Sequence, residues 1–136
     1  MPLPFASEEW LKSLMVKINE SEAYRSAAKT WEGDFYFVVE PEGSDTKPVI
    51  MYVDLWHGSC RDAYVVEDEG AMDPEFRINA SMGAWETVVT KRLDPIQALM
   101  TRKLKLQGNM MKIMRAVKAA QELVECCTQV DTEFPA

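Results

Sequence analysis

The residues best suited to chemistry lie near the middle of the chain, in the WHGSC segment at residues 56–60. His57 is the only histidine, and an imidazole beside a thiol such as Cys60 can activate a nucleophile, with Asp54 or Asp62 orienting the ring. However, this segment is typical of a tight hairpin turn, where a solvated histidine beside a strand cysteine is the commoner arrangement. We therefore expect no catalytic residue, and a Cys60–His57 enzyme remains an alternative.

Metal and cofactor sites are not indicated either. Residues 67–75 contain five acids that could bind a hard cation through oxygen, but they lack the ligand spacing of an EF-hand, so we expect a solvated acidic loop. One histidine and three scattered cysteines do not form a usual zinc ligand set, and no glycine-rich phosphate loop is present. We expect no cofactor, no metal and reduced thiols.

The net charge of −7 is distributed unevenly along the 136 residues. Residues 1–90 hold 7 basic and 17 acidic side chains, whereas residues 91–118 hold 8 basic side chains and 1 acidic side chain. An acidic chain of this kind is a poor general binder of nucleic acid, because such binding requires neutralised phosphates. The basic block indicates either the solvated faces of helices or a patch for transient contact with an anionic membrane surface. The predicted patch consists of Lys91, Arg92, Arg102, Lys103, Lys105 and Lys112.

The order of hydrophobic periods predicts one α+β domain over residues 1–136. Helical spacing covers residues 7–31 in two pieces, with Ser7 as the first cap and a second possible cap near Ser21. Strands are predicted at 35–39, which the turn 41–43 closes, and at 49–56, 61–66, 76–82 and 104–106; helices are predicted at 85–91, from Asp94, and at 109–127. We expect a five-stranded, largely antiparallel sheet with helices on one face, closed by the last helix.

Nearly the whole chain, and the C-terminal third most clearly, resembles the sterol carrier protein 2 family of lipid-binding domains. The resemblance rests on LDP at 93–95, ALM at 98–100, KLKL at 103–106 and GNM at 108–110, and upstream on WEGD at 31–34 before FVVE at 37–40. It implies a five-stranded sheet, helices that cover it, and between them an apolar tunnel for a sterol, a fatty acyl chain, acyl-CoA or an isoprenoid lipid. It also implies binding without catalysis.

This chain departs from the family pattern at two positions. Members often carry glycine before the Leu-Asp-Pro and before the Lys-Leu-Lys, whereas this chain has Lys91-Arg92 and Thr101-Arg102 there. The side chains reduce backbone freedom and add charge at both ends of the short helix.

The residues expected to contact a ligand are those on the predicted inner faces of the strand at 76–82 and of the helices that follow. Nine methionines add an adaptable apolar surface. The predicted ligand-binding residues are Phe76, Ile78, Met82, Trp85, Leu99, Met100, Met110, Ile113, Met114 and Val117. An interaction domain of lipid metabolism, with a pocket filled by its own side chains, is the main alternative.

The location and oligomeric state are expectations from absent or weak signals. The N-terminal region lacks an apolar signal segment, and the chain ends in neither a prenylation box nor a peroxisomal tripeptide, so we expect the cytosol. Exposed edge strands and the aromatic hairpin at 49–66 are compatible with a homodimer.

Overall fold

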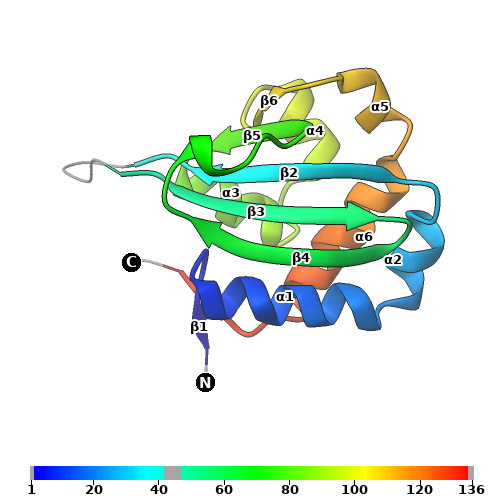
Figure 1. Ribbon diagram of the computed structural model, residues 1–136, viewed down its shortest axis with the longest axis horizontal. Coiled ribbons are helices and arrows are strands. Elements are labelled where there is room, and N and C mark those ends of the chain that lie inside the picture. Colours follow the sequence, from blue (N-terminus) through cyan, green and yellow to red (C-terminus); the bar gives the residue numbers. More distant parts are fainter. Residues whose placement is uncertain (1, 42–46, 135–136) are drawn as a thin grey trace.

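The computed structural model describes residues 2–41 and 47–134, in which one five-stranded sheet is covered by helices (Figure 1). The strands are β1 (Leu3–Pro4), β2 (Glu32–Val39), β3 (Val49–Trp56), β4 (Ser59–Val66), β5 (Phe76–Ala80), β6 (Lys105–Gln107) and β7 (Thr132–Glu133). The helices are α1 (Glu8–Glu20), α2 (Glu22–Ala27), α3 (Met82–Val89), α4 (Pro95–Met100), α5 (Met110–Met114) and α6 (Val117–Thr128), with a 3₁₀ turn at Glu69–Ala71. The predicted α+β class is confirmed.

The main sheet has the strand order β4-β3-β2-β5-β6. The β2–β5 pair is parallel and the other three pairs are antiparallel, so the largely antiparallel sheet is confirmed with one parallel pair in its middle. His57 and Gly58 join β3 to β4, with φ angles of 51° and 83°, as the predicted tight hairpin requires. The turn predicted at 41–43 lies mostly outside the described residues.

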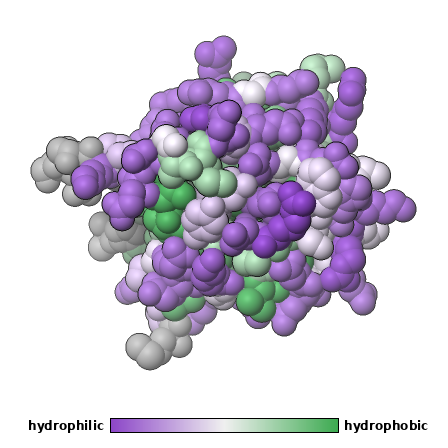
Figure 2. Space-filling view, viewed as in Figure 1, coloured by the Kyte–Doolittle hydropathy of each residue, from purple (hydrophilic) through white to green (hydrophobic). Residues whose placement is uncertain are grey.

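Strict alternation along the central strands separates the two faces of the sheet. Phe35, Phe37 and Val39 of β2 point to the helices, while Tyr36 and Val38 point the other way. The outer face carries a small apolar cluster beneath the 3₁₀ turn and is otherwise mostly hydrophilic (Figure 2). The helix-facing side therefore holds the main core.

Short polar side chains start the helices where the sequence predicts. Backbone N–H groups in the first turns donate to Ser7 and Ser21 at 3.1 and 3.0 Å, and to Asp94 and Asn109 at 2.9 and 3.3 Å. These bonds satisfy N–H groups that have no partner inside the helix. The helix expected to start at residue 85 instead begins at Met82, because Ser81 caps it by accepting from the Ala84 N–H at 3.2 Å, and β5 consequently ends at Ala80.

The final helix is two helices, contrary to the single helix predicted over 109–127. α5 ends at Met114 and α6 begins at Val117, with Ala116 at φ −119° and ψ 35° between them. No glycine or proline lies at this break, so tertiary contacts set it. Lys112 anchors α5 to the sheet through Glu75, whereas α6 packs against α1, α2, α3 and α4.

Lys91 and Arg102 lie in the two segments where family members often carry glycine. Both residues have a left-handed backbone, with φ of 64° and 61°. Lys91 follows the end of α3, where the Lys91 N–H donates to Val88 and the Arg92 N–H to Thr87, each at 3.0 Å. This is the hydrogen-bond pattern of a glycine-ended helix. The chain thus keeps the geometry of a glycine turn with strained non-glycine residues.

The two ends of the chain meet in a parallel pair that the sequence analysis did not predict. β1 pairs with β7, and Phe5 after β1 packs against Trp10 of α1 and Phe134 after β7, with ring centroids 4.8 and 5.3 Å apart. This contact holds the start of the chain against the helix-covered side of the sheet.

Candidate functional site

An apolar cavity of about 120 Å³ lies between the sheet and the helices. The sheet contributes residues of β2, β3 and β5, and α1, α2, α3, α4, α5 and α6 contribute the remaining wall together with Phe5, Trp31, Leu104 and Ala116. Seven of the lining residues are aromatic and none is charged. Such a wall favours hydrocarbon and offers no counter-charge to an ion.

The polar atoms of the aromatic wall are largely turned away from the cavity. The indole N–H of Trp10 donates to Thr132 Oγ1 at 2.8 Å, that of Trp31 to the Gly33 carbonyl at 3.1 Å, and that of Trp85 to the Val38 carbonyl at 2.9 Å. These bonds fix the rings so that their carbon surfaces line the space. The wall is therefore apolar. It is rigid on the side of the sheet, because Trp31 and Trp85 are bonded to carbonyl groups of β2.

Five of the residues that line the cavity are only half-buried. Phe37 of β2 and Ala116 are two of them, and Pro95 of α4 with Ala120 and Leu123 of α6 are the other three. Next to them, the Gln121 amide donates to the carboxylate of Asp94 at 3.0 Å, which links α6 to the start of α4.

Four of the ten predicted ligand-binding residues line this cavity, namely Ile78, Trp85, Leu99 and Ile113. Phe76 is fully buried beside the cavity and stacks on Phe35 at 5.1 Å between centroids. Met82, Met110, Met114 and Val117 are half-buried against the main core but do not border the cavity. Met100 is 60% exposed and points away from it.

Part of the remaining wall comes from the helical segment that the sequence predicts over residues 7–31. Trp10, Leu11 and Leu14 form the apolar stripe of α1, and Tyr24 and Trp31 continue it. Their helical spacing was visible in the sequence, but spacing does not distinguish a side chain that fills the core from one that borders a cavity.

Cys60 and His57 do not form a catalytic pair in this geometry. The His57 Nε2 atom lies 2.6 Å from a carboxylate oxygen of Glu32, and the Cys60 thiol donates to the Asp62 carbonyl at 3.3 Å. Burial raises the pKa of Cys60 to about 12, so the thiolate that catalysis would need is scarce at neutral pH. The three cysteines are free and buried.

The predicted basic patch is largely neutralised by neighbouring carboxylates. Four of its six residues form ion pairs: Lys91 with Glu125, Arg92 with Glu86, Lys105 with Glu40 and Lys112 with Glu75. Arg102 and Lys103 are exposed and make no ion pair with a described residue. Within the predicted patch, the free positive charge is therefore confined to two residues just after α4.

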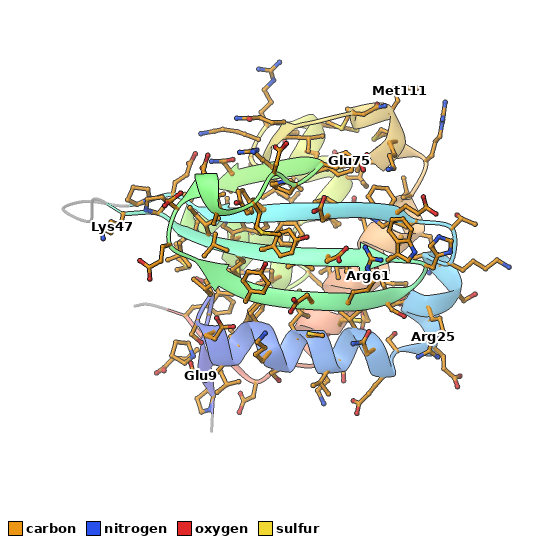
Figure 3. All side chains as sticks on the ribbon, viewed as in Figure 1. Glu9, Arg25, Lys47, Arg61, Glu75 and Met111 are labelled. Atoms are coloured by element: carbon orange, nitrogen blue, oxygen red, sulfur yellow. The ribbon has the colours of Figure 1, made fainter. Side chains whose placement is uncertain are left out.

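A second, polar pocket of about 320 Å³ lies on the outer face of the sheet, where Figure 3 places Arg61 and Glu75. Its carboxylates have partners: Asp54 pairs with Arg61 at 3.1 Å and Glu75 with Lys112 at 2.7 Å. In the acidic loop, Arg77 pairs with Glu69 and Asp73. Over residues 2–41 and 47–134, no three His, Cys, Asp or Glu side chains are grouped as metal ligands.

Comparison with known proteins agrees with the fold. The family model of the SCP-2 sterol transfer family matches residues 11–121. A crystal structure of sterol carrier protein 2 is 40% identical, with 93% of this chain and 98% of that chain covered and a TM-score of 0.83. A conserved protein of Thermus thermophilus, described as a possible sterol carrier protein, is 39% identical, with coverage of 97% and 92% and a TM-score of 0.86.

A more distant structure shares the fold alone. The apo form of sterol carrier protein 2 from Yarrowia lipolytica is 18% identical, with 85% of this chain and 87% of that chain covered and a TM-score of 0.58. A search of curated proteins gave no match. Within the described ranges, none of the helices combines the length and hydrophobicity needed to cross a bilayer.

The family match extends over most of the sequence, and the two structures near 40% identity superpose along nearly the whole chain. Together with a charge-free cavity between sheet and helices, this places the protein among lipid- and sterol-binding domains: the chain belongs to the SCP-2 sterol transfer family.

Proposed function

We propose that this protein binds a hydrophobic ligand in the cavity between sheet and helices and carries it without chemical change. The observation that supports this most directly is the wall itself, in which no residue is charged and the indole N–H groups are bonded to protein atoms. Burial of an apolar chain there is favourable by roughly 25 cal/mol per Å², before the cost of ordering the ligand. Ile78, Trp85, Leu99 and Ile113 are the predicted contacts.

The small size of the cavity means that its walls must move before a large ligand can enter. A volume of about 120 Å³ is small beside the roughly 300–1,000 Å³ of typical ligand pockets, so a sterol or a long acyl chain requires the walls to move apart. We place this movement between α4 and α6, because Pro95, Ala120 and Leu123 there are only half-buried and a single side-chain hydrogen bond, from Gln121 to Asp94, joins α6 to the start of α4.

The same small volume favours one second candidate, an interaction domain of lipid metabolism whose pocket its own side chains nearly fill. Native mass spectrometry of gently purified protein, followed by denaturing extraction, separates the two. A bound acyl chain, sterol, isoprenoid or acyl-CoA near one per chain supports the carrier. A ligand-free mass, with no uptake from a mixed lipid extract, refutes it and leaves the interaction domain.

Contact with a membrane is a further part of the proposal. Arg102 and Lys103 are free positive charges, and Met100 beside them is 60% exposed. Each basic residue near an anionic surface contributes about 1 kcal/mol, so the contact is weak and transient. Flotation with phosphatidylserine vesicles should recover wild-type protein and lose the Arg102→Glu/Lys103→Glu variant; equal recovery would contradict the contact.

The cytosolic location and the homodimer remain predictions, and each can be tested directly. A cytosolic location is compatible with three unpaired cysteines and is tested by cell fractionation. A homodimer through an edge strand, β4 or β6, is tested by sedimentation velocity.

A further inference from the structure

Tyr24 of α2 differs from the other tyrosines in the hydrogen bonding of its hydroxyl. Its side chain lines the cavity and is only 2% exposed, yet its hydroxyl makes no hydrogen bond to any described residue. The other three tyrosines all have partners. Tyr36 bonds to the backbone of Glu69 and Met72, Tyr52 donates to Asp34 at 2.8 Å, and Tyr64 donates to the Met72 sulfur at 3.4 Å.

The unpaired hydroxyl is not sealed by protein atoms. Among the described residues, every fully enclosed side-chain nitrogen or oxygen has a partner, so the Tyr24 oxygen must keep some accessible surface. The open space that Tyr24 borders is the apolar cavity. A buried hydroxyl without a partner is unfavourable, and a ligand atom that reaches it from the cavity and bonds to it removes the cost.

The chemistry around Tyr24 restricts what that ligand atom can be. Burial and the nearby thiols of Cys60 and Cys126 raise the pKa of Tyr24, so the group stays a neutral hydroxyl that can donate or accept. No lysine, arginine or histidine lines the cavity, so a carboxylate placed there would have no counter-charge. An uncharged oxygen function has neither problem.

We propose that the Tyr24 hydroxyl binds the uncharged polar end of the ligand, an alcohol or a carbonyl, and so selects lipids with a neutral oxygen function. This inference rests on the proposed carrier function and assigns one residue to specificity within it. The rest of the ligand lies along the aromatic wall, where it makes apolar contacts only.

The test measures the affinities of decan-1-ol, decane and decanoate at pH 8 by displacement of a fluorescent lipid. Tyr24→Phe removes one oxygen and keeps the ring, so it should lower the ratio of decan-1-ol to decane affinity by roughly 2- to 10-fold, the range of one hydrogen bond. Wild-type protein should bind decanoate more weakly than decan-1-ol. The matched control, Tyr36→Phe, removes a hydroxyl from the outer face and should leave the ratio unchanged.

The outcomes are distinguishable. An unchanged ratio in Tyr24→Phe, or an equal loss of affinity for the alcohol and the alkane, overturns the role of Tyr24 while the carrier function stands. Tighter binding of decanoate than of decan-1-ol by wild type also overturns it. Binding of none of the three ligands by wild type refutes the carrier function itself, and this inference with it. A Tyr24→Phe variant less stable than wild type would reveal a protein partner for the hydroxyl and contradict the proposal.

Discussion

Filling the cavity from α6 should separate stability from binding. Ala119 lines the cavity and is 6% exposed, so Ala119→Leu directs three additional carbons into the empty space. At about 0.8 kcal/mol per buried carbon, the gain for the free protein is at most about 2.4 kcal/mol. An independent figure is similar: at about 24 cal/mol per Å³, an empty volume of about 120 Å³ costs roughly 3 kcal/mol.

The same three carbons occupy space that a ligand would use. Ligand affinity should therefore fall by up to about 2.4 kcal/mol, or roughly 60-fold, while the free protein becomes more stable by about 1–2 kcal/mol after some strain from packing. Displacement of a fluorescent lipid measures the affinity, and urea unfolding of delipidated protein measures the stability. Opposite signs in the two assays are the expected result.

Ala23 of α2 provides the matched control, because it is exposed and Ala23→Leu adds the same atoms outside the cavity. The free energy of unfolding and the free energy of ligand binding of Ala23→Leu should both stay within about 0.5 kcal/mol of wild type. Unchanged ligand affinity in Ala119→Leu would show that the ligand binds elsewhere. Strong destabilisation of the free variant would show that the cavity cannot receive a leucine side chain, and would refute the volume argument.

Three further results are expected. Arg102→Gly should raise the free energy of unfolding by about 1 kcal/mol, because glycine adopts the φ of 61° without strain; urea unfolding with no gain would contradict that account. Gln121→Ala removes the hydrogen bond to Asp94 and should speed ligand release roughly 2- to 10-fold in stopped-flow dilution, whereas an unchanged rate would place the exit elsewhere. Cys60 should react slowly with a thiol reagent at pH 8 unless the protein unfolds, because burial raises its pKa to about 12, and fast labelling of folded protein would revive the enzyme alternative.

Local signals in the sequence were sufficient for most elements of the fold. The caps at Ser7, Asp94 and Asn109 and the alternation along β5 depend on neighbours within a few residues, so the sequence displays them directly. The pairing of β1 with β7 and the break between α5 and α6 depend on contacts between distant segments. Two-residue strands have no periodicity to detect, and Ala116 carries no intrinsic helix-breaking property.

At the two positions that lack the family's glycine, the backbone differs from what the side chains predict. Replacement of glycine near the ends of the short helix predicts altered loop geometry, but Lys91 and Arg102 adopt left-handed backbone all the same. The surrounding packing and the hydrogen bonds at the helix end outweigh a cost of about 1–2 kcal/mol at each residue. The tertiary fold therefore determines the backbone at these two residues, and their side chains add charge there.

The composition of the wall bears on how a cavity this small could admit a ligand under the proposed carrier function. The sequence favoured methionines as the adaptable surface, yet within the described residues only Met51 lines the cavity. On the sheet side, aromatic rings stack on one another and Trp85 is tied to β2, so this side resists movement. On the opposite side, no side chain caps the first turn of α6, which contributes Ala119, Ala120, Leu123, Val124 and Cys127. Under the proposed carrier function, entry of a ligand therefore requires a shift of α6 and not only rearrangement of flexible side chains, while the sheet and, as proposed, the Tyr24 hydroxyl keep their positions.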